Sequence, residues 1–237
     1  MKKQAVILLS GGLDSATVAA TAISQGYNLY ALSFRYGQKH QEELNAVKKI
    51  IKFFNQNSEP DTPNIIEHNI IDLDPSIFLN SSLVNDINVP KNRNLSKNDI
   101  PNTYVPARNI IFLSYATAYA ESRNICNIFI GANEVDYSGY PDCRPKFLSS
   151  FEDMINIGTK LGQEQKISVI APLLHLTKAE IIKKGLELKL DYSITHSCYD
   201  PIDGYSCGQC DSCRLRLKGF KENNITDPIK YLNIKQA

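Results

Sequence analysis

A hexapeptide near the N-terminus has the residue types of a phosphate-binding loop. Residues 10–15 read SGGLDS and lie between an apolar run at 5–9 and an Ala-rich stretch at 16–23. The unbroken apolar run predicts a strand buried on both faces, and the Ala-rich stretch predicts a helix that ends at Gly26. A glycine turn between strand and helix presents free backbone N–H groups and the positive end of the helix dipole to an anion. Asp14 is placed to hold a magnesium ion beside bound phosphates.

The pattern of this loop narrows the kind of phosphate site. No lysine follows the glycines, so the loop is not a Walker-type P-loop, and the dinucleotide fingerprint G-x-G-x-x-G is also absent. SGGLDS instead resembles the PP-loop of the ATP pyrophosphatases, which grip the β,γ-pyrophosphate of ATP and transfer AMP to a substrate oxygen. The alternative is an ordinary Gly-Gly turn. The resemblance implies nucleotide contacts by Leu8, Leu9, Ser10, Gly11, Gly12, Leu13, Asp14, Ser15, Ala16, Thr17 and Val18.

Four of the six cysteines form a cluster near the C-terminus with the spacing C-x8-C-x2-C-x2-C. Each C-x2-C turn presents two thiolates to one ion, and four thiolates close a tetrahedral zinc site with Zn–S distances of about 2.3 Å. Such a site has no open position for water, so its role is structural. An iron–sulfur cluster is the alternative, but Leu217 stands where a ferredoxin pattern would continue with cysteine. The predicted ligands are Cys198, Cys207, Cys210 and Cys213.

Alternating strand and helix patterns predict a parallel sheet that positions these groups. Further strands are predicted at residues 28–34, 64–69, 127–132 and 167–170, and helices at 42–54, from 104 onward, at 147–161 and at 177–190. Thr177 and Glu180 have the spacing of a capping box. The order of elements predicts a Rossmann-like α/β fold, in which ligands gather at the carboxyl ends of the strands.

Three loops with polar residues follow predicted strands or open a predicted helix. Residues 36–40 (YGQKH) contain Lys39 and His40, for which plain surface polarity is the alternative. Residues 104–109 (YVPARN) open a long helix, with Pro106 expected in its first turn. Arg108 opposes the helix dipole there, which favours a nearby anion or carboxylate. The richest loop, residues 133–145, follows the fourth predicted strand.

Composition and charge limit the class of function. The chain has 237 residues, a net charge of +1 and 43% hydrophobic residues, which are ordinary values for a globular α/β protein without a nucleic-acid footprint. The five apolar residues at 5–9 are too few for a signal peptide or a membrane span, so we expect a cytoplasmic protein with reduced cysteines. We expect a nucleotide-binding domain at residues 1–190 and a zinc-binding segment at 191–237 packed on it.

Residues 80–102 are rich in Asn, Ser, Lys and Asp and show neither a helical nor a strand period. A stretch of this length without a period predicts a mobile loop. It is either a lid that orders over the site when ligands bind or a surface loop with no catalytic part.

Five segments, in order, resemble the 7-cyano-7-deazaguanine synthase family of the queuosine precursor pathway, and the similarity covers nearly the whole chain. The segments are SGGLDS (10–15), YGQKH (36–40), YVPARN (104–109), GANEVDYSGYPDCRPKF (131–147) and SCYDPIDGYSCGQCDSCRLRLKGF (197–220). The chain departs from the family pattern at Arg35, where an acidic residue is common, and at Ala16, where Thr is common. The first departure leaves no carboxylate to carry over at that position.

The resemblance implies a homodimeric, zinc-containing ligase with the adenine nucleotide alpha-hydrolase-like fold. It would convert 7-carboxy-7-deazaguanine, ammonia and ATP into the nitrile through adenylated intermediates, with Mg²⁺ accompanying ATP and no direct nucleic-acid or membrane partner. The residues implied for catalysis are Ser10, Asp14, Lys39, His40 and Arg108. Those implied for substrate binding are Tyr104, Arg108, Asn133, Asp136, Tyr140, Asp142 and Arg144.

Two other functions remain open from the residues. A PP-loop enzyme of tRNA thiolation would use Cys143 or Cys126 to carry sulfur, but the chain lacks a basic RNA-binding face or an appended domain. A non-enzymatic, nucleotide-binding regulator held by zinc would need no polar substrate loop after the fourth strand.

Overall fold

The computed structural model describes residues 3–38, 42–57, 59, 61–79, 81–85, 87–94, 100–135 and 139–232. Within this part the strands form one parallel five-stranded sheet with the order β3-β2-β1-β4-β5, which confirms the predicted Rossmann-like α/β class. The strands are β1 (Lys3–Leu8), β2 (Tyr27–Arg35), β3 (Ile65–Asp72), β4 (Asn127–Phe129) and β5 (Ser168–Ile170). The chain moves outward from β1 to β3 and then returns to the other side of β1, so the topological switch point lies between β1 and β4.

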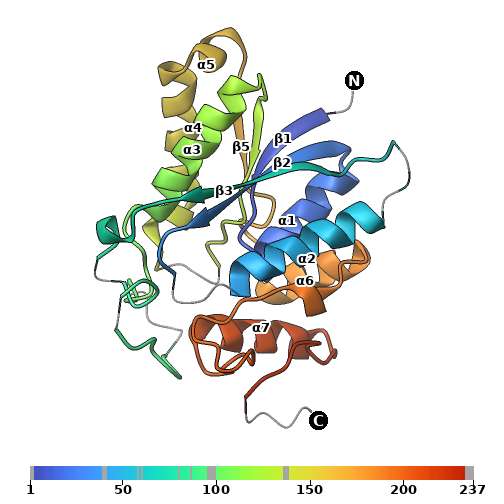
Figure 1. Ribbon diagram of the computed structural model, residues 1–237, viewed down its shortest axis with the longest axis vertical. Coiled ribbons are helices and arrows are strands. Elements are labelled where there is room, and N and C mark those ends of the chain that lie inside the picture. Colours follow the sequence, from blue (N-terminus) through green and yellow to red (C-terminus); the bar gives the residue numbers. More distant parts are fainter. Residues whose placement is uncertain are drawn as a thin grey trace.

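Helices cover both faces of the sheet (Figure 1). One layer holds α1 (Leu13–Ser24), α2 (Glu42–Gln56) and α6 (Lys178–Glu187). The other holds α3 (Arg108–Ser122) and α4 (Pro145–Gly158), followed by the short α5 (Lys160–Glu164). These two layers bury opposite faces of the central strand, because Ile7 packs toward the first layer while Val6 and Leu8 pack toward the second. The unbroken apolar run of β1 follows from this burial on both faces.

Several predicted element boundaries differ from the structure by two or more residues. Pro106 was expected in the first turn of the helix that holds Arg108, but α3 begins at Arg108, after Ala107 in the left-handed conformation with φ 54°. The helix expected at 147–161 is two helices, because Thr159 adopts an extended conformation and caps α5 by accepting a hydrogen bond from Gly162 N. The strand expected at 127–132 is shorter, and β4 ends at Phe129.

The structure confirms the predicted helix end at Gly26 and the predicted capping box. Gly26 follows α1 with φ 91° and its N–H donates to Ile23 O, as expected of a glycine that ends a helix. Thr177 and Glu180 form the complete capping box of α6.

The C-terminal segment packs beneath α6, where α7 (Asp211–Glu222) lies (Figure 1). Phe220 of α7 shares the core of α1, α2 and α6. Arg216 and Asp227 form an ion pair with 2.7 Å between Nε and Oδ2, and each side chain is only 1% exposed. The segment also touches the PP-loop, since His196 N donates to Gly11 O over 2.9 Å.

The described part of residues 80–102 is packed against the C-terminal segment. Val89 lies in one apolar cluster with the four clustered cysteines. Lys91 pairs with Asp200 over 2.6 Å, and Arg93 pairs with Asp211 over 2.9 Å. The mobility expected of this segment stays a prediction. None of the helices in the described ranges is long and apolar enough to cross a membrane.

Candidate active site

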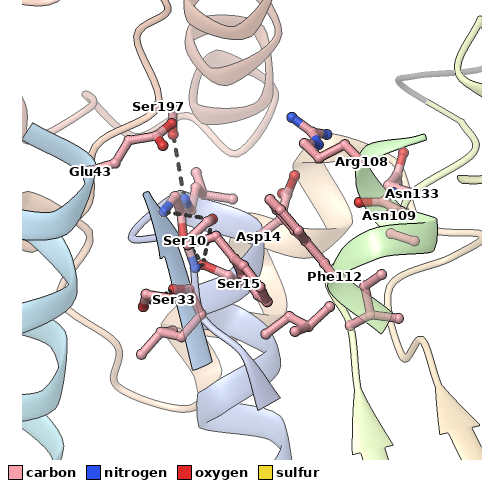
Figure 2. A pocket seen from close by; sticks show the side chains of 18 of the residues that line it. Ser10, Asp14, Ser15, Ser33, Glu43, Arg108, Asn109, Phe112, Asn133 and Ser197 are labelled. Carbon is pink, nitrogen blue, oxygen red and sulfur yellow. Dashed lines mark hydrogen bonds between the residues drawn. The ribbon is translucent and has the colours of Figure 1, made fainter. Parts of the chain in front are cut away.

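A cavity of about 200 Å³ opens at the carboxyl ends of β1, β2 and β4, beside the switch point of the sheet. The PP-loop, residues 10–15, forms its floor, and α2, α3 and the C-terminal segment form its walls (Figure 2). Its lining includes seven of the eleven residues that we predicted to contact a nucleotide: Leu8, Leu9, Ser10, Gly12, Leu13, Asp14 and Ser15. The side chains of Ala16 and Val18 are fully buried in the core, as is Thr17. These three residues and Gly11 lie outside the cavity lining.

Backbone N–H groups of the PP-loop are held by serine hydroxyls. Ser10 N donates to Ser15 Oγ over 3.2 Å, Gly12 N donates to Ser10 Oγ over 3.3 Å, and Leu13 N donates to Ser197 Oγ over 3.4 Å. These distances lie at or beyond the long end of the hydrogen-bond range, whereas bonds to a charged oxygen are shorter and stronger. A phosphate that enters the loop would therefore compete well for the same donors.

Asp14 forms an ion pair that sequence analysis did not anticipate. Lys178, the first residue of α6, places Nζ at 2.6 Å and 2.9 Å from the two carboxylate oxygens of Asp14, and the two side chains are 7% and 21% exposed. A carboxylate keeps further lone pairs while it accepts these bonds, so Asp14 still fits the role of a magnesium ligand. The sequence does carry one indication of this pair, because a lysine at a helix N-terminus opposes the helix dipole and, like Arg108, favours a nearby carboxylate.

Arg108 has the neighbouring carboxylate that its place at a helix N-terminus requires. Burial disfavours the charge on Arg108, but Tyr36, Asp142 and Tyr140 raise the pKa of its guanidinium above the ordinary value. Asp142 is itself buried and its Oδ2 accepts a hydrogen bond from Asn109 N over 3.1 Å, which caps the start of α3. Arg108 lines the cavity, whereas Asp142 is not among the lining residues and acts on Arg108 electrostatically.

The four clustered cysteines form a second candidate site, outside the cavity. All four are buried and carry free thiols, and their sulfur atoms lie within 4.8 Å of one another. Backbone N–H groups of Asp200 and Cys207 donate to Cys198 Sγ over 3.3 Å and 3.2 Å. Cys207 Sγ accepts in the same way from Gln209 and Cys210, over 3.4 Å and 3.3 Å. Such donors stabilise thiolates, so the cluster could hold a metal ion with all four sulfurs as ligands.

Comparisons with known proteins establish the family. The family model described as queuosine biosynthesis protein QueC matches residues 4–224. The chain belongs to the QueC family. A 7-cyano-7-deazaguanine synthase from Citrifermentans bemidjiense is 54% identical over 233 residues, which cover 98% of this chain and 99% of that protein. A second protein of the same name, from Desulfatibacillum aliphaticivorans, is 52% identical over 237 residues, covering 98% and 97% of the two chains.

A solved structure shares the fold at low sequence identity. The structure of NMN synthetase from Francisella tularensis aligns with a TM-score of 0.50 and 20% identity, covering 94% of this chain and 78% of that chain. It confirms the architecture that the sheet order shows.

The other predicted catalytic and substrate residues of this QueC-family chain divide into three groups. Asn133 and Tyr140 line the cavity with Arg108. Tyr104 and the exposed Arg144 lie outside the lining, although the Tyr104 ring lies 5.9 Å from the ring of Tyr140. The third group, Lys39, His40 and Asp136, lies outside the described residues.

Three aromatic side chains form a wall of the cavity that the sequence analysis did not predict. Phe34 and Phe112 stack with 3.9 Å between ring centroids and an interplanar angle of 6°, and Tyr36 meets Phe112 at 5.6 Å. All three line the cavity, and burial raises the pKa of Tyr36 to about 12. The sequence pattern around Phe112 indicated only a buried position in a helix, and the pattern around Phe34 indicated only a position in a strand. Further lining residues that were not predicted to bind a nucleotide or this substrate are Ser33, Glu43, Leu44, Asn109, Cys143, His196, Ser197, Tyr199 and Ser212.

Neither candidate cysteine has the surroundings of a sulfur carrier. Burial raises the pKa of Cys143 to about 11, and the neighbouring Asp142 adds to the increase, so the thiol stays protonated at neutral pH. Cys126 precedes β4 and therefore lies at the amino edge of the sheet, opposite the cavity. These positions give the tRNA-thiolation alternative no support.

Proposed function

We propose that this QueC-family chain is a 7-cyano-7-deazaguanine synthase, a ligase that converts 7-carboxy-7-deazaguanine and ammonia into the nitrile at the expense of ATP. The names of relatives that match over nearly the full chain support the proposal. The observation that carries it in the structure is one cavity in which a PP-loop, an arginine and an aromatic wall face the same space. A nucleotide, a carboxylate and a planar base are the three chemical groups that such a cavity fits.

The chemistry explains why ATP is needed. A carboxylate oxygen is a poor leaving group, so transfer of AMP to that oxygen, with release of pyrophosphate, makes the carbon reactive. Attack of ammonia forms the C–N bond and releases AMP, which leaves an amide. A second AMP transfer, to the amide oxygen, followed by loss of AMP and the remaining N–H protons, forms the nitrile. The two rounds consume two ATP molecules for each nitrile.

The PP-loop residues have the clearest roles in this proposal. The N–H groups of the loop and the hydroxyl of Ser10 bind the pyrophosphate oxygens, where charge develops as the phosphoryl bond breaks. Magnesium, held by Asp14 with ATP, supplies charge neutralisation there when bound. Lys178 orients the carboxylate of Asp14 through the two short hydrogen bonds at 2.6 Å and 2.9 Å.

The residues proposed for the substrate lie around Arg108. Its guanidinium neutralises the carboxylate or the phosphate of the adenylate, and the negative charge of Asp142 stabilises the charged guanidinium. Tyr140 and Asn133 contribute the adjacent lining, and the aromatic wall packs on a planar ring. Tyr104, Asp136 and Arg144 remain proposed for substrate contacts, and Lys39 and His40 for neutralising phosphate charge, from the family resemblance alone.

We further propose one structural zinc ion per chain, bound by the four clustered cysteines, with the described part of residues 80–102 packed against it. The donor set supports zinc, because four thiolates with N–H···S hydrogen bonds are the ligands of a closed tetrahedral site. The family resemblance supports a cytoplasmic homodimer. Exposed apolar side chains on α4, Met154 at 53% and Ile157 at 77%, offer surface for such an interface.

The direct test is an incubation of the purified protein with ATP, magnesium, ammonium chloride and 7-carboxy-7-deazaguanine, followed by mass spectrometry. We expect the amide and then the nitrile, with two AMP formed per nitrile. Without ammonium we expect AMP and pyrophosphate but no amide. The absence of amide and nitrile, together with no substrate-dependent AMP, would rule the proposed function out.

A further inference from the structure

Glu43 is a carboxyl group in the cavity that the roles above do not use. It lies in the first turn of α2, and its side chain lines the cavity on the side away from α3 (Figure 2). Its main chain is fixed against the PP-loop, because a Cβ added to Gly11 would come within 2.2 Å of Glu43 O. The position of the carboxyl relative to the loop is therefore set by close backbone packing.

The Glu43 carboxylate differs from that of Asp14 in its partners. Asp14 is held by Lys178 through two hydrogen bonds, whereas within the described ranges no hydrogen bond or ion pair engages the carboxylate of Glu43. Arg108 interacts with it electrostatically across the cavity. Glu43 therefore has open oxygen atoms that face the space where the substrate would react.

The pKa of the Glu43 carboxyl group allows it to accept and release a proton near neutral pH. Burial raises the pKa of this carboxyl to about 7, and the positive charge of Arg108 limits the increase. Glu43 in turn contributes electrostatically to the raised pKa of Tyr36. The other described titratable groups in the lining are Asp14, Arg108, Tyr140, Cys143, His196 and Tyr199. Tyr36 and Cys143 keep their protons, with pKa values raised to about 12 and about 11.

We propose that Glu43 is the general base of the nitrogen-dependent steps, an inference that rests on the proposed function. When ammonia attacks the adenylated carboxyl carbon, the C–N bond forms and the nitrogen becomes positively charged. The Glu43 carboxylate accepts a proton from that nitrogen. The electron pair that the attack placed on the former carbonyl oxygen then re-forms the C=O bond and expels AMP as the C–O bond to AMP breaks. In the second round the adenylated amide nitrogen carries two protons. One leaves to solvent to give the neutral imidate, and the Glu43 carboxylate accepts the other as the C–O bond to AMP breaks and the C≡N bond forms.

Arg108 and Glu43 then have different roles on opposite sides of the cavity. Arg108 neutralises the carboxylate and phosphate oxygens, and Glu43 receives one proton from nitrogen in each of the two rounds. The proton goes on to solvent before each further round, which a carboxyl that titrates near neutral pH allows.

Two reactions of the same enzyme distinguish a role of Glu43 as general base from a role in binding ATP or the substrate. Exchange of labelled pyrophosphate into ATP, in the presence of 7-carboxy-7-deazaguanine, needs adenylation but no ammonia. Amide formation in a single turnover needs both. For Glu43→Gln we expect amide formation to fall by about 10² to 10⁴-fold, with pyrophosphate exchange close to that of the unchanged protein. Glu42→Gln, in the same turn of α2 but outside the lining, is the matched control and is expected to keep both rates.

The pH profile provides the second readout. At a constant concentration of free ammonia, kcat/KM of the unchanged protein is expected to rise through a pKa of about 7 as Glu43 loses its proton, and to level off above it. Glu43→Gln is expected to lose that rise, and Glu43→Asp to keep one at a shifted midpoint. Circular dichroism and zinc content check that each variant is folded.

Three outcomes would overturn the role of Glu43. Amide formation at the unchanged rate in Glu43→Gln is one. An equal loss of pyrophosphate exchange and amide formation is another, because it would indicate a binding role. A rise near pH 7 that persists in Glu43→Gln is the third. Failure of the proposed function itself looks different, since the unchanged protein would then form no amide under any condition.

Discussion

Gly11→Ala tests how the PP-loop is fitted against α2. Gly11 has φ +88°, a conformation that costs a residue with a Cβ about 1–2 kcal/mol. The new Cβ would also lie 2.2 Å from Glu43 O and 3.2 Å from Ala46 Cβ. Because the nearest atom is backbone, the loop and the helix must separate by about 1 Å, and overpacking of this kind costs about 1–3 kcal/mol. We therefore expect a loss of about 2–5 kcal/mol in the free energy of unfolding.

Two further glycines separate the two contributions. Gly26→Ala meets the same backbone penalty at φ +91° but has no atom within 4 Å, so we expect a loss of only about 1–2 kcal/mol. Gly158→Ala meets neither penalty and is expected to change stability by less than about 1 kcal/mol. Urea denaturation of the three variants gives the free energies, and thermal melts are expected to show a decrease of about 4–20 °C for Gly11→Ala.

The refuting result is a Gly11→Ala protein as stable as Gly26→Ala. It would show that the contact with Glu43 O is not tight and that α2 does not fix the loop. Pyrophosphate–ATP exchange adds a functional readout. It is expected to fall in Gly11→Ala, where the floor of the cavity is displaced, and to be unchanged in Gly26→Ala, which lies at the opposite end of α1.

Three other predictions concern the site and its supports. Asp14→Asn and Ser10→Ala are expected to lower pyrophosphate–ATP exchange by about 10²-fold or more while leaving the fold intact, and near-normal exchange in Asp14→Asn would contradict the phosphate-site assignment. Cys210→Ser is expected to lose the bound metal and to lower the melting temperature, because thiolate coordination and folding are linked; metal analysis of the unchanged protein should give one zinc per chain, and iron with acid-labile sulfide would contradict it. Limited proteolysis within residues 80–102 is expected to slow when a non-hydrolysable ATP analogue and 7-carboxy-7-deazaguanine are both present, and equal cleavage with and without ligands would leave a surface loop with no catalytic part.

Local patterns were sufficient for the fold class and for two of its chemical groups. The unbroken apolar run of β1, the glycines after it and the helix that follows form one continuous stretch, so the strand–turn–helix unit and its free N–H groups could be read directly. The cysteines gather in sixteen residues, and their spacing alone brings four sulfurs together, which the structure confirms within 4.8 Å. Arg108 stood out because a cation at a helix N-terminus requires a compensating group, and that group is Asp142.

The walls of the cavity depended on contacts between distant parts of the chain. Glu43 at the start of α2, Phe112 in α3 and Ser197 after α6 have ordinary local patterns, and they meet only because parallel strands place the loops that follow them at one edge. Lys178 lies 164 positions from Asp14 in the chain and forms its closest ion pair. A periodicity reports which face of an element is buried, but it carries no record of which other element covers that face. For this reason the floor of the site was readable from one hexapeptide, whereas the pairing of Asp14 and the charge state of Glu43 arise from packing across the whole sheet.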